Sequence, residues 1–272
     1  MKYFIPLILA LVMICCQQKT GNDDVGTRVR ENTSFRFTKE KALEVIASGF
    51  NAGDGYREVW IRDFNTFIEP AALAYPKEEL KENLLVFFRM QGDDGNIIDG
   101  FTPAHLIGEG ETDFSYSDLE PRYAGHKNTV ETDQETSLIQ AVYKYIRSTG
   151  DSTILAARIG GLTVAERMEQ AVEFLLEHRY ADEYGLIWGA TTADWGDVQP
   201  EHGWGVDLDS NTHRAIDIYD NAMFVIALNN MAAMIPQKQE KYRKLRDQVS
   251  IGIRKHLWDP GEQKFIPHIY LE

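Results

Sequence analysis

The chain has 272 residues, of which 43% are hydrophobic and 26% charged, and its formal net charge is −14. This composition is that of a globular protein with room for one large domain or two small ones. Because an acidic surface without a stripe of Lys or Arg repels phosphate backbones, it argues against a nucleic-acid partner.

The N-terminal residues have the pattern of an export signal. Lys2 precedes an apolar run at residues 3–14, which is too short to span a bilayer, and Cys15, Cys16 and a polar stretch follow. An apolar run that ends at cysteine resembles a bacterial lipoprotein signal. The resemblance implies acylation of Cys16, export, and attachment to a bacterial membrane by the lipid alone, at the periplasmic face or the cell surface. An ordinary signal peptide and an uncleaved anchor are the alternatives.

The sequence therefore predicts three segments. These are a signal peptide at residues 1–15, a polar flexible tether at 16–34 and a folded domain at 35–272. Cys15 and Cys16 are the only cysteines of the sequence. The mature domain is thus expected to have no disulfide bond and no metal site built on cysteine.

Helical periodicity dominates the domain. Apolar residues recur at helical spacing, with Thr38 as the expected N-cap of the first helix and Pro76 at the start of the third. The expected helices cover residues 39–48, 62–74, 76–90, 133–148, 162–178, 216–234 and 237–257. No segment alternates as a strand over more than a few residues. The predicted fold class is all-α, built from helical hairpins stacked as a toroid or a solenoid, although no fixed repeat is visible.

Two long loops interrupt this pattern, at residues 91–132 and 179–212, and loops of this length in a compact domain are often functional. Near them lie three polar clusters. The first contains Trp60, Arg62 and Asp63 before an apolar helix. An aromatic face can stack on a pyranose while charged groups hydrogen-bond its hydroxyls. The alternative is an Asp that caps its own helix and an Arg in a structural ion pair.

The second cluster contains Glu131, Thr132, Asp133 and Glu135, where the first long loop meets the next helix. Thr132 and Glu135 have the spacing of a capping box, which would explain both residues without a functional role. Glu131 and Asp133 are left unexplained by that interpretation, although acidic residues are common in a first helical turn.

The third cluster contains Asp194, Trp195 and Asp197 in the second long loop. Glycosidic cleavage needs a carboxyl group whose pKa is raised by apolar surroundings, and an Asp beside a Trp is suited to that role. The alternative is that these Asp residues form turns. No metal site is expected, because residues 207–211 begin like a calcium loop but lack its later ligands. No cofactor is expected either, since no glycine-rich phosphate loop is present.

Together the three clusters resemble the six-hairpin, or (α/α)6-barrel, glycosidases, over residues 56–272. This group includes glucoamylase-like enzymes, glycogen-debranching and processing α-glucosidases, and cellobiose-type phosphorylases. The resemblance implies a glycoside hydrolase that inverts the configuration at the cleaved bond, with phosphorolysis as the less expected reaction. In the phosphorylase branch the Asp after the Trp is the general acid, which implies Asp197, with Asp194 as the second candidate.

The same resemblance implies a carbohydrate-binding site at the described clusters. The residues expected to bind the sugar are Trp60, Arg62, Asp63, Glu131, Asp133 and Trp195. About seven helices are predicted where a full barrel has twelve, so the toroid is expected to be incomplete at the C-terminus. A catalytic base is not identified. Two other classes stay open, a non-catalytic glycan-binding surface lipoprotein and a structural helical-repeat protein that binds no sugar.

Overall fold

The structure is a computed structural model that describes residues 25–271, apart from 52, 54, 112, 113, 128, 131, 191–198 and 200–207. The predicted signal peptide and its lipidation residue, Cys16, lie outside the described residues. Two compact units divide the chain, at residues 1–44 and 45–272.

The first unit contains α1 (Val25–Glu31) and most of α2 (Thr33–Ile46). Residues 25–31 fall in the segment predicted as a tether, and they are helical. The prediction that Thr38 caps the next helix is wrong, because Thr38 lies inside α2 and its hydroxyl donates to the Ser34 carbonyl (2.9 Å). The Asn32 side chain takes the capping role, accepting from the backbone N–H groups of Ser34 and Phe35 (2.9 and 3.2 Å).

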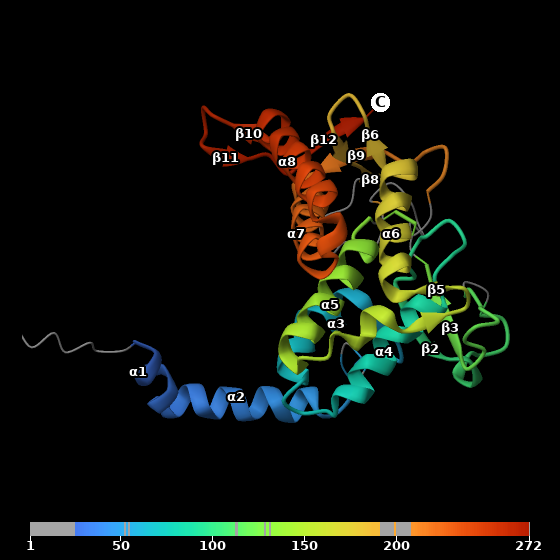
Figure 1. The fold of residues 1–272 in the computed structure, drawn as a ribbon, viewed down its shortest axis with the longest axis vertical. Coiled ribbons are helices and arrows are strands. Elements are labelled where there is room, and N and C mark those ends of the chain that lie inside the picture. The colour runs from blue at the N-terminus through green and yellow to red at the C-terminus, as the bar shows by residue number, and fades with distance from the viewer. Residues whose placement is uncertain are drawn as a thin grey trace, which may run out of the picture. The chain divides into compact units, whose positions relative to one another are not determined.

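Helices dominate the described part of the second unit. They are α3 (Ile61–Ala71), α4 (Lys77–Arg89), α5 (Gln134–Thr149), α6 (Val164–His178), α7 (Ile218–Met234) and α8 (Gln239–His256). Three short 3-10 helices accompany them, η1 (Ala104–Leu106), η2 (Ser152–Ala156) and η3 (Pro236–Lys238). In sequence order every second helix is an inner one: α3 packs against α5 and α5 against α7 (Figure 1). Helices α4 and α6 pack on α5, and α8 packs along α7. The predicted all-α class is confirmed.

The centre of this unit is α5. Its residues 134–142 are all buried, whereas a surface helix buries one stripe. The apolar core around it includes Phe64, Ile68, Leu138, Val142, Phe224 and Leu228. The first turn of α5 is polar as well as buried, since Gln134, Glu135, Thr136 and Ser137 are there. Buried polar groups need partners, so this helix start is where a polar site is expected.

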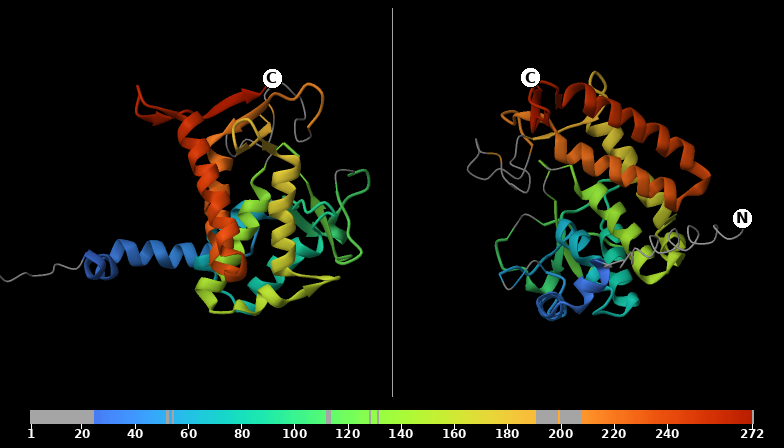
Figure 2. Two further views of the ribbon diagram at one scale, coloured as in Figure 1. Left: turned by 45° about the horizontal axis from the view of Figure 1, so that its top comes forward. Right: turned by 90° about the vertical axis from the view of Figure 1, so that its left-hand side faces the viewer.

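Short antiparallel strands lie between the helices. One sheet has the order β1 (Val59–Trp60), β2 (Gly100–Pro103), β3 (Tyr123–His126), and another has β12 (His268–Leu271), β9 (Arg214–Asp217), β8 (Gly189–Ala190). Three hairpins complete the set, β4 (Arg158–Ile159) with β5 (Leu162–Thr163), β6 (Tyr180–Ala181) with β7 (Leu186–Ile187), and β10 (Trp258–Asp259) with β11 (Lys264–Phe265). Because β1 leads directly into α3 and β9 into α7, the two larger sheets lie where inner helices begin (Figure 2).

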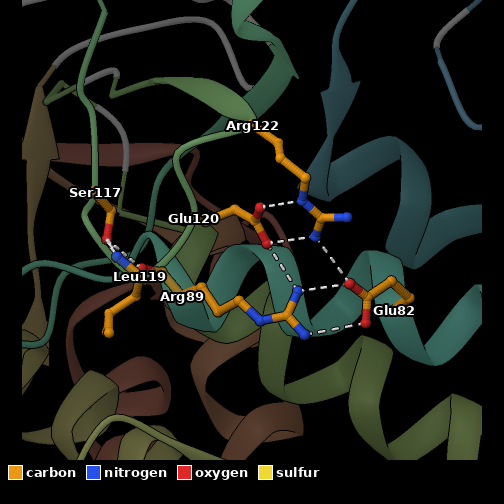
Figure 3. A network of polar contacts seen from close by, with 6 residues as sticks. All are labelled: Glu82, Arg89, Ser117, Leu119, Glu120 and Arg122. Atoms are coloured by element: carbon orange, nitrogen blue, oxygen red, sulfur yellow. Dashed lines mark hydrogen bonds and ion pairs between the residues drawn. The ribbon is translucent and has the colours of Figure 1, made fainter.

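The first long loop is fastened to α4 by a network of charges (Figure 3). The buried Glu120 carboxylate accepts hydrogen bonds from Arg89 (2.8 Å) and Arg122 (2.7 and 2.9 Å). Glu82 accepts from the same two guanidinium groups, at 2.7 to 3.1 Å. These contacts lower the pKa of both carboxyl groups, with hydrogen bonds from the arginines as the largest cause. The contacts thus hold Glu120 and Arg122 of the first long loop against α4.

Among the described residues, no single helix has both the length and the apolar composition needed to cross a membrane. The α7–α8 pair meets that criterion only when its two helices, bent by 117°, are counted together.

Candidate active site

The starts of the three inner helices bring polar side chains together. The Asp133 carboxylate, directly before α5, lies 3.7 Å from the Arg62 guanidinium in the first turn of α3. The Tyr219 hydroxyl, in the first turn of α7, donates to the other Asp133 oxygen (3.0 Å). Three helices that are distant in sequence therefore meet at one carboxylate.

Arg62 is a buried cation between two buried carboxylates. It is 7% exposed, and its guanidinium lies 3.8 Å from Asp99 and 3.7 Å from Asp133. Asp99 is positioned by the backbone, because its carbonyl accepts from the Ile61 N–H (2.8 Å) and its own N–H donates to His126 (2.8 Å). Distances of this size indicate ion pairs more than short hydrogen bonds. Arg62 is therefore in ion pairs, as the non-functional interpretation of its cluster expected, and one of its partners, Asp99, was not singled out by the sequence.

Asp133 is available to the site because it does not cap its helix. It is the N-cap residue of α5, yet its side chain makes no capping hydrogen bond. Burial raises the pKa of Asp133 to about 6, against the opposing effects of Arg62 and the Tyr219 hydrogen bond. Burial, followed by the charge of Asp133, also raises the pKa of Tyr219. A carboxyl group of this kind can accept from a sugar hydroxyl when ionised and donate to it when protonated.

The capping box predicted for Thr132 and Glu135 is not formed. The Thr132 hydroxyl donates to the Trp188 carbonyl (3.1 Å). The Glu135 carboxylate accepts from the Ile97 N–H (2.8 Å) and the Lys127 ammonium group (3.3 Å). Both side chains are fully buried, so backbone groups of neighbouring segments compete for them with the helix start.

An aromatic group borders the start of α3. The Trp60 and His126 rings stack with centroids 5.4 Å apart, and Phe114 lies 4.3 Å from His126. In the sheet, Gly100 pairs with both Trp60 and His126. A Cβ atom at Gly100 would lie 2.7 Å from the Trp60 ring, so the two rings can meet only above a glycine. Trp60 was predicted to stack on a sugar, and the structure shows it stacked on His126.

A second aromatic residue lies between two cations. The Arg179 and Arg214 guanidinium groups lie 4.9 and 5.4 Å from the Trp188 ring centroid, within the range of cation–π attraction. Arg179 is buried, which lowers its pKa. The Trp188 backbone leads into β8, so these contacts fix the strand that precedes residues 191–198.

The predicted site residues fall into two sets. Arg62 and Asp133 are in contact, Trp60 lies two positions before Arg62, and the half-buried Asp63 follows Arg62 in α3. Glu131, Asp194, Trp195 and Asp197 lie outside the described residues. The segments that flank them are nevertheless adjacent, because the Ala190 N–H donates to the Val130 carbonyl (2.9 Å).

Sequence reasoning missed Asp99, His126, Tyr219 and Asp220. The sequence could have indicated Asp220, because Asp217 at the N-cap and Asp220 in the first turn are acidic residues at the start of a largely apolar helix. No sequence feature distinguished Asp99, because several other Asp residues occur in the same loop. Within the part of the chain that the structure describes, no group of three His, Cys, Asp or Glu residues is placed to hold a metal ion.

The family model "Glycosyl hydrolase 94 superfamily, catalytic domain" matches residues 31–268. Among solved structures, the chain is similar to a rhamnosidase from Klebsiella oxytoca with rhamnose bound, with a TM-score of 0.53 and 15% identity. That match covers 85% of this chain and 41% of the rhamnosidase, so the chain spans about two fifths of that enzyme. No curated protein matches. At this identity the structural likeness concerns the fold, and it confirms the predicted toroid of helical hairpins.

Proposed function

This chain belongs to the glycosyl hydrolase 94 superfamily, and on that basis we propose that it cleaves glycosidic bonds in an oligo- or polysaccharide. The observation that carries the proposal is the buried Arg62, held between Asp99 and Asp133 where α3 and α5 begin. Burial of a charge is costly, and an Arg between carboxylates at converging helix starts is suited to a ligand rich in hydroxyl groups. The proposed substrate is therefore a carbohydrate, and no cofactor is required.

The proposed roles follow from the chemistry of each side chain. Arg62, Asp63 and Asp133 hydrogen-bond the sugar whose bond is cleaved, with Glu131 as a further partner, while Trp60 and Trp195 border it. Asp197 donates its proton to the leaving oxygen as the bond from that oxygen to C1 breaks. Water attacks C1 from the opposite face, which inverts the configuration, and gives up its proton to a base that we do not assign.

Phosphate is the alternative nucleophile. If phosphate attacks C1, the product is a sugar phosphate, and no separate base is needed because phosphate is already anionic. The two reactions are distinguished by assaying the full-length protein on a panel of oligosaccharides in buffers with and without inorganic phosphate. Release of free sugar without phosphate supports the hydrolase that we propose, whereas product formation that requires phosphate replaces hydrolysis by phosphorolysis.

The decisive variant is Asp197→Asn. Loss of the proton donor is expected to lower turnover of natural glycosides roughly 10²–10⁴-fold, the usual range for acid catalysis. The loss on a glycosyl fluoride is expected to be much smaller, because fluoride departs without protonation. Asp194→Asn is the matched control. An equal loss on both substrate types would remove Asp197 from the acid role and leave Asp194 and Glu131 as candidates.

The competing function is glycan binding without turnover, as in a surface receptor. Calorimetric titration of the same oligosaccharides distinguishes it. Binding that is unaffected by Asp197→Asn and is never followed by cleavage would favour the receptor. Absence of both binding and turnover over the whole panel would favour a structural role.

We also propose that the protein is exported and anchored by a lipid on Cys16, with a signal peptide at 1–15, a tether from 16 and the catalytic domain from 35. The support is the apolar run that ends at Cys15 and Cys16. Incorporation of an alkyne fatty acid into the protein, lost in Cys16→Ser, is the expected result. Label that persists in Cys16→Ser contradicts the assignment.

A further inference from the structure

One buried carboxyl group near the site has no role in the proposed chemistry. Asp220 is in the first turn of α7 and is 6% exposed. Its backbone N–H donates to Asp217 Oδ1 (2.7 Å), which caps the helix. Its carboxyl group makes further hydrogen bonds with the side chains of Asp217 and Thr132. Thr132 is the residue whose expected capping box with Glu135 is not formed.

These contacts fasten strand β8 to the start of α5. The Thr132 hydroxyl donates to the Trp188 carbonyl (3.1 Å), and the Ala190 N–H donates to the Val130 carbonyl (2.9 Å). Gly189 between them has no space for a side chain, because a Cβ atom would lie 2.7 Å from Thr132 Oγ1 and 3.3 Å from Asp220 Oδ2. The strand is thus held directly against Thr132 and Asp220.

The hydrogen bonds of Thr132 require one proton more than its hydroxyl supplies. Thr132 contacts both the Asp220 carboxyl group and the Trp188 carbonyl, and each of these two contacts needs a proton. The single hydroxyl proton is donated to the Trp188 carbonyl, which can only accept. The second proton must therefore come from the Asp220 carboxyl group.

The surroundings favour Asp220 as the group that holds it. Asp220 faces the carboxylates of Asp217 and Asp133, and the positive charge that acts on it from the end of α6 is that of Arg179. Burial raises the pKa of Asp220 well above its ordinary value, and the charges of Asp217 and Asp133 raise it further. Asp217 is less buried than Asp220, and its Oδ1 already accepts the Asp220 N–H at the helix start.

We infer that Asp220 is a protonated positioning residue that, together with Thr132, holds β8 in the place that catalysis requires. The requirement for catalysis rests on the proposed function, but the protonated state does not. Residues 191–198 follow β8 directly in the chain and include Asp194 and Asp197. A fixed β8 therefore gives the proposed proton donor one fixed attachment point.

The protonated state is tested by stability, without any substrate. Asp220→Asn in the full-length protein keeps a donor N–H but does not titrate. A carboxyl group with a raised pKa contributes stability at low pH that is lost as the pH rises through that pKa. Between pH 4.5 and 8 the Tm of wild type is expected to fall relative to Asp220→Asn, by about 3 °C or more. Asp182→Asn, at an exposed position, is the control. A Tm difference that stays constant over this range would overturn the inference.

The positioning role is tested by activity. Thr132→Val removes the hydroxyl and is expected to lower kcat/KM roughly tenfold or more, while Thr132→Ser keeps the hydroxyl and is expected to stay within about threefold of wild type. Wild-type activity is expected to fall as Asp220 ionises, and this alkaline fall is expected to be absent in Asp220→Asn. If wild type and Asp220→Asn lose activity in the same way at alkaline pH, the protonated Asp220 carboxyl group does not position β8 for catalysis. If no glycoside is turned over at all, the proposed function fails, and the Tm comparison still decides the protonated state.

Discussion

Two helix starts in this domain share one sequence pattern and use it differently. Thr163 and Glu166 at α6 form a reciprocal capping box, with Thr163 Oγ1 accepting from the Glu166 N–H (3.2 Å) and Glu166 from the Thr163 N–H (2.7 Å). Thr132 and Glu135 at α5 have the same spacing and form no such box. Their side chains bind the Trp188 carbonyl and the Ile97 N–H instead.

Burial explains the difference. Glu166 is exposed at the start of an outer helix, where its carboxylate hydrogen-bonds to Thr163 of the same helix start. Thr132 and Glu135 are fully buried at the start of the central helix, where neighbouring backbone groups need partners. A capping motif thus stabilises its own helix at the surface, whereas in the interior its side chains connect segments and build the site. Four variants test this comparison, and their expected effects decrease in the order given.

The largest effect is expected from Glu135→Ala. The change leaves the Lys127 ammonium and the Ile97 N–H without their carboxylate in the interior. Removing one partner of a buried ion pair typically costs about 3–5 kcal/mol of unfolding free energy. Urea denaturation of Glu135→Ala and Glu166→Ala measures the contrast, and Glu166→Ala is expected to lose about 1 kcal/mol. Equal small losses in both variants would mean that burial does not separate the two motifs.

The next effect concerns the pH dependence of stability at Asp133. Its pKa of about 6 in the folded state lies above the ordinary value of 3.8, and this difference corresponds to about 3 kcal/mol. Because the folded state binds this proton more tightly, the associated stability is complete below about pH 4 and is lost as the pH rises towards 6. Asp133→Asn is expected to remove that loss.

Chemical denaturation at pH 4, 5, 6 and 7 measures this dependence as the difference between wild type and Asp133→Asn. A paired comparison is needed because other carboxyl groups act in the opposite direction. Glu82 and Glu120 have lowered pKa values and gain stability as the pH rises. If the difference does not change with pH, Asp133 is already ionised at pH 4, and burial has not raised its pKa.

The sequence predicted these helices because their determinants are local. Periodicity identified α3 to α8, and Gly150 ends α5 in the left-handed conformation that favours glycine (φ 72°). Arg62 and Asp133 were identified from their chemistry and from the family resemblance. The short strands were not predicted, since strands of two to four residues carry no measurable alternation.

The remaining site residues depend on contacts between distant segments. Asp99 is 37 positions from Arg62 in the sequence. It is brought next to Arg62 by the hydrogen bond from the Ile61 N–H to its carbonyl, a contact that the sequence does not reveal. Asp220 reaches Thr132 across 88 positions. The capping box at Thr132 failed for the same reason, because local spacing cannot tell whether a helix start is buried. Tertiary burial therefore decided where prediction from the sequence was wrong.

The third effect compares two arginines that each lie between two carboxylates. Arg62→Lys keeps the charge but loses the planar fork, which is expected to lower kcat/KM roughly 30-fold, or about 2 kcal/mol of transition-state binding. Arg89 binds Glu82 and Glu120, which have no proposed role in the site (Figure 3), so Arg89→Lys is expected to lower stability and leave kcat/KM unchanged. Steady-state kinetics and denaturation of both variants separate the two roles. Equal kinetic losses would show that Arg62 acts only on the fold.

The smallest effect is expected from Thr163→Ala. Loss of an N-cap hydroxyl usually costs about 1 kcal/mol, which in a domain of this size lowers Tm by about 2–4 °C. Thr163→Ser is the matched control, because it keeps the capping oxygen and is expected to retain most of the stability. Activity is expected to stay at the wild-type level in both variants, since the cap joins Thr163 and Glu166 of α6, neither of which has a proposed role in the site. The two motifs are thus expected to differ in the property each controls: at α6 a change at Thr163 affects folding alone, whereas at α5 a change at Thr132 lowers kcat/KM. A fall in kcat/KM for Thr163→Ala comparable to that of Thr132→Val would mean that helix stability, and not the bond to Trp188, is what the site depends on.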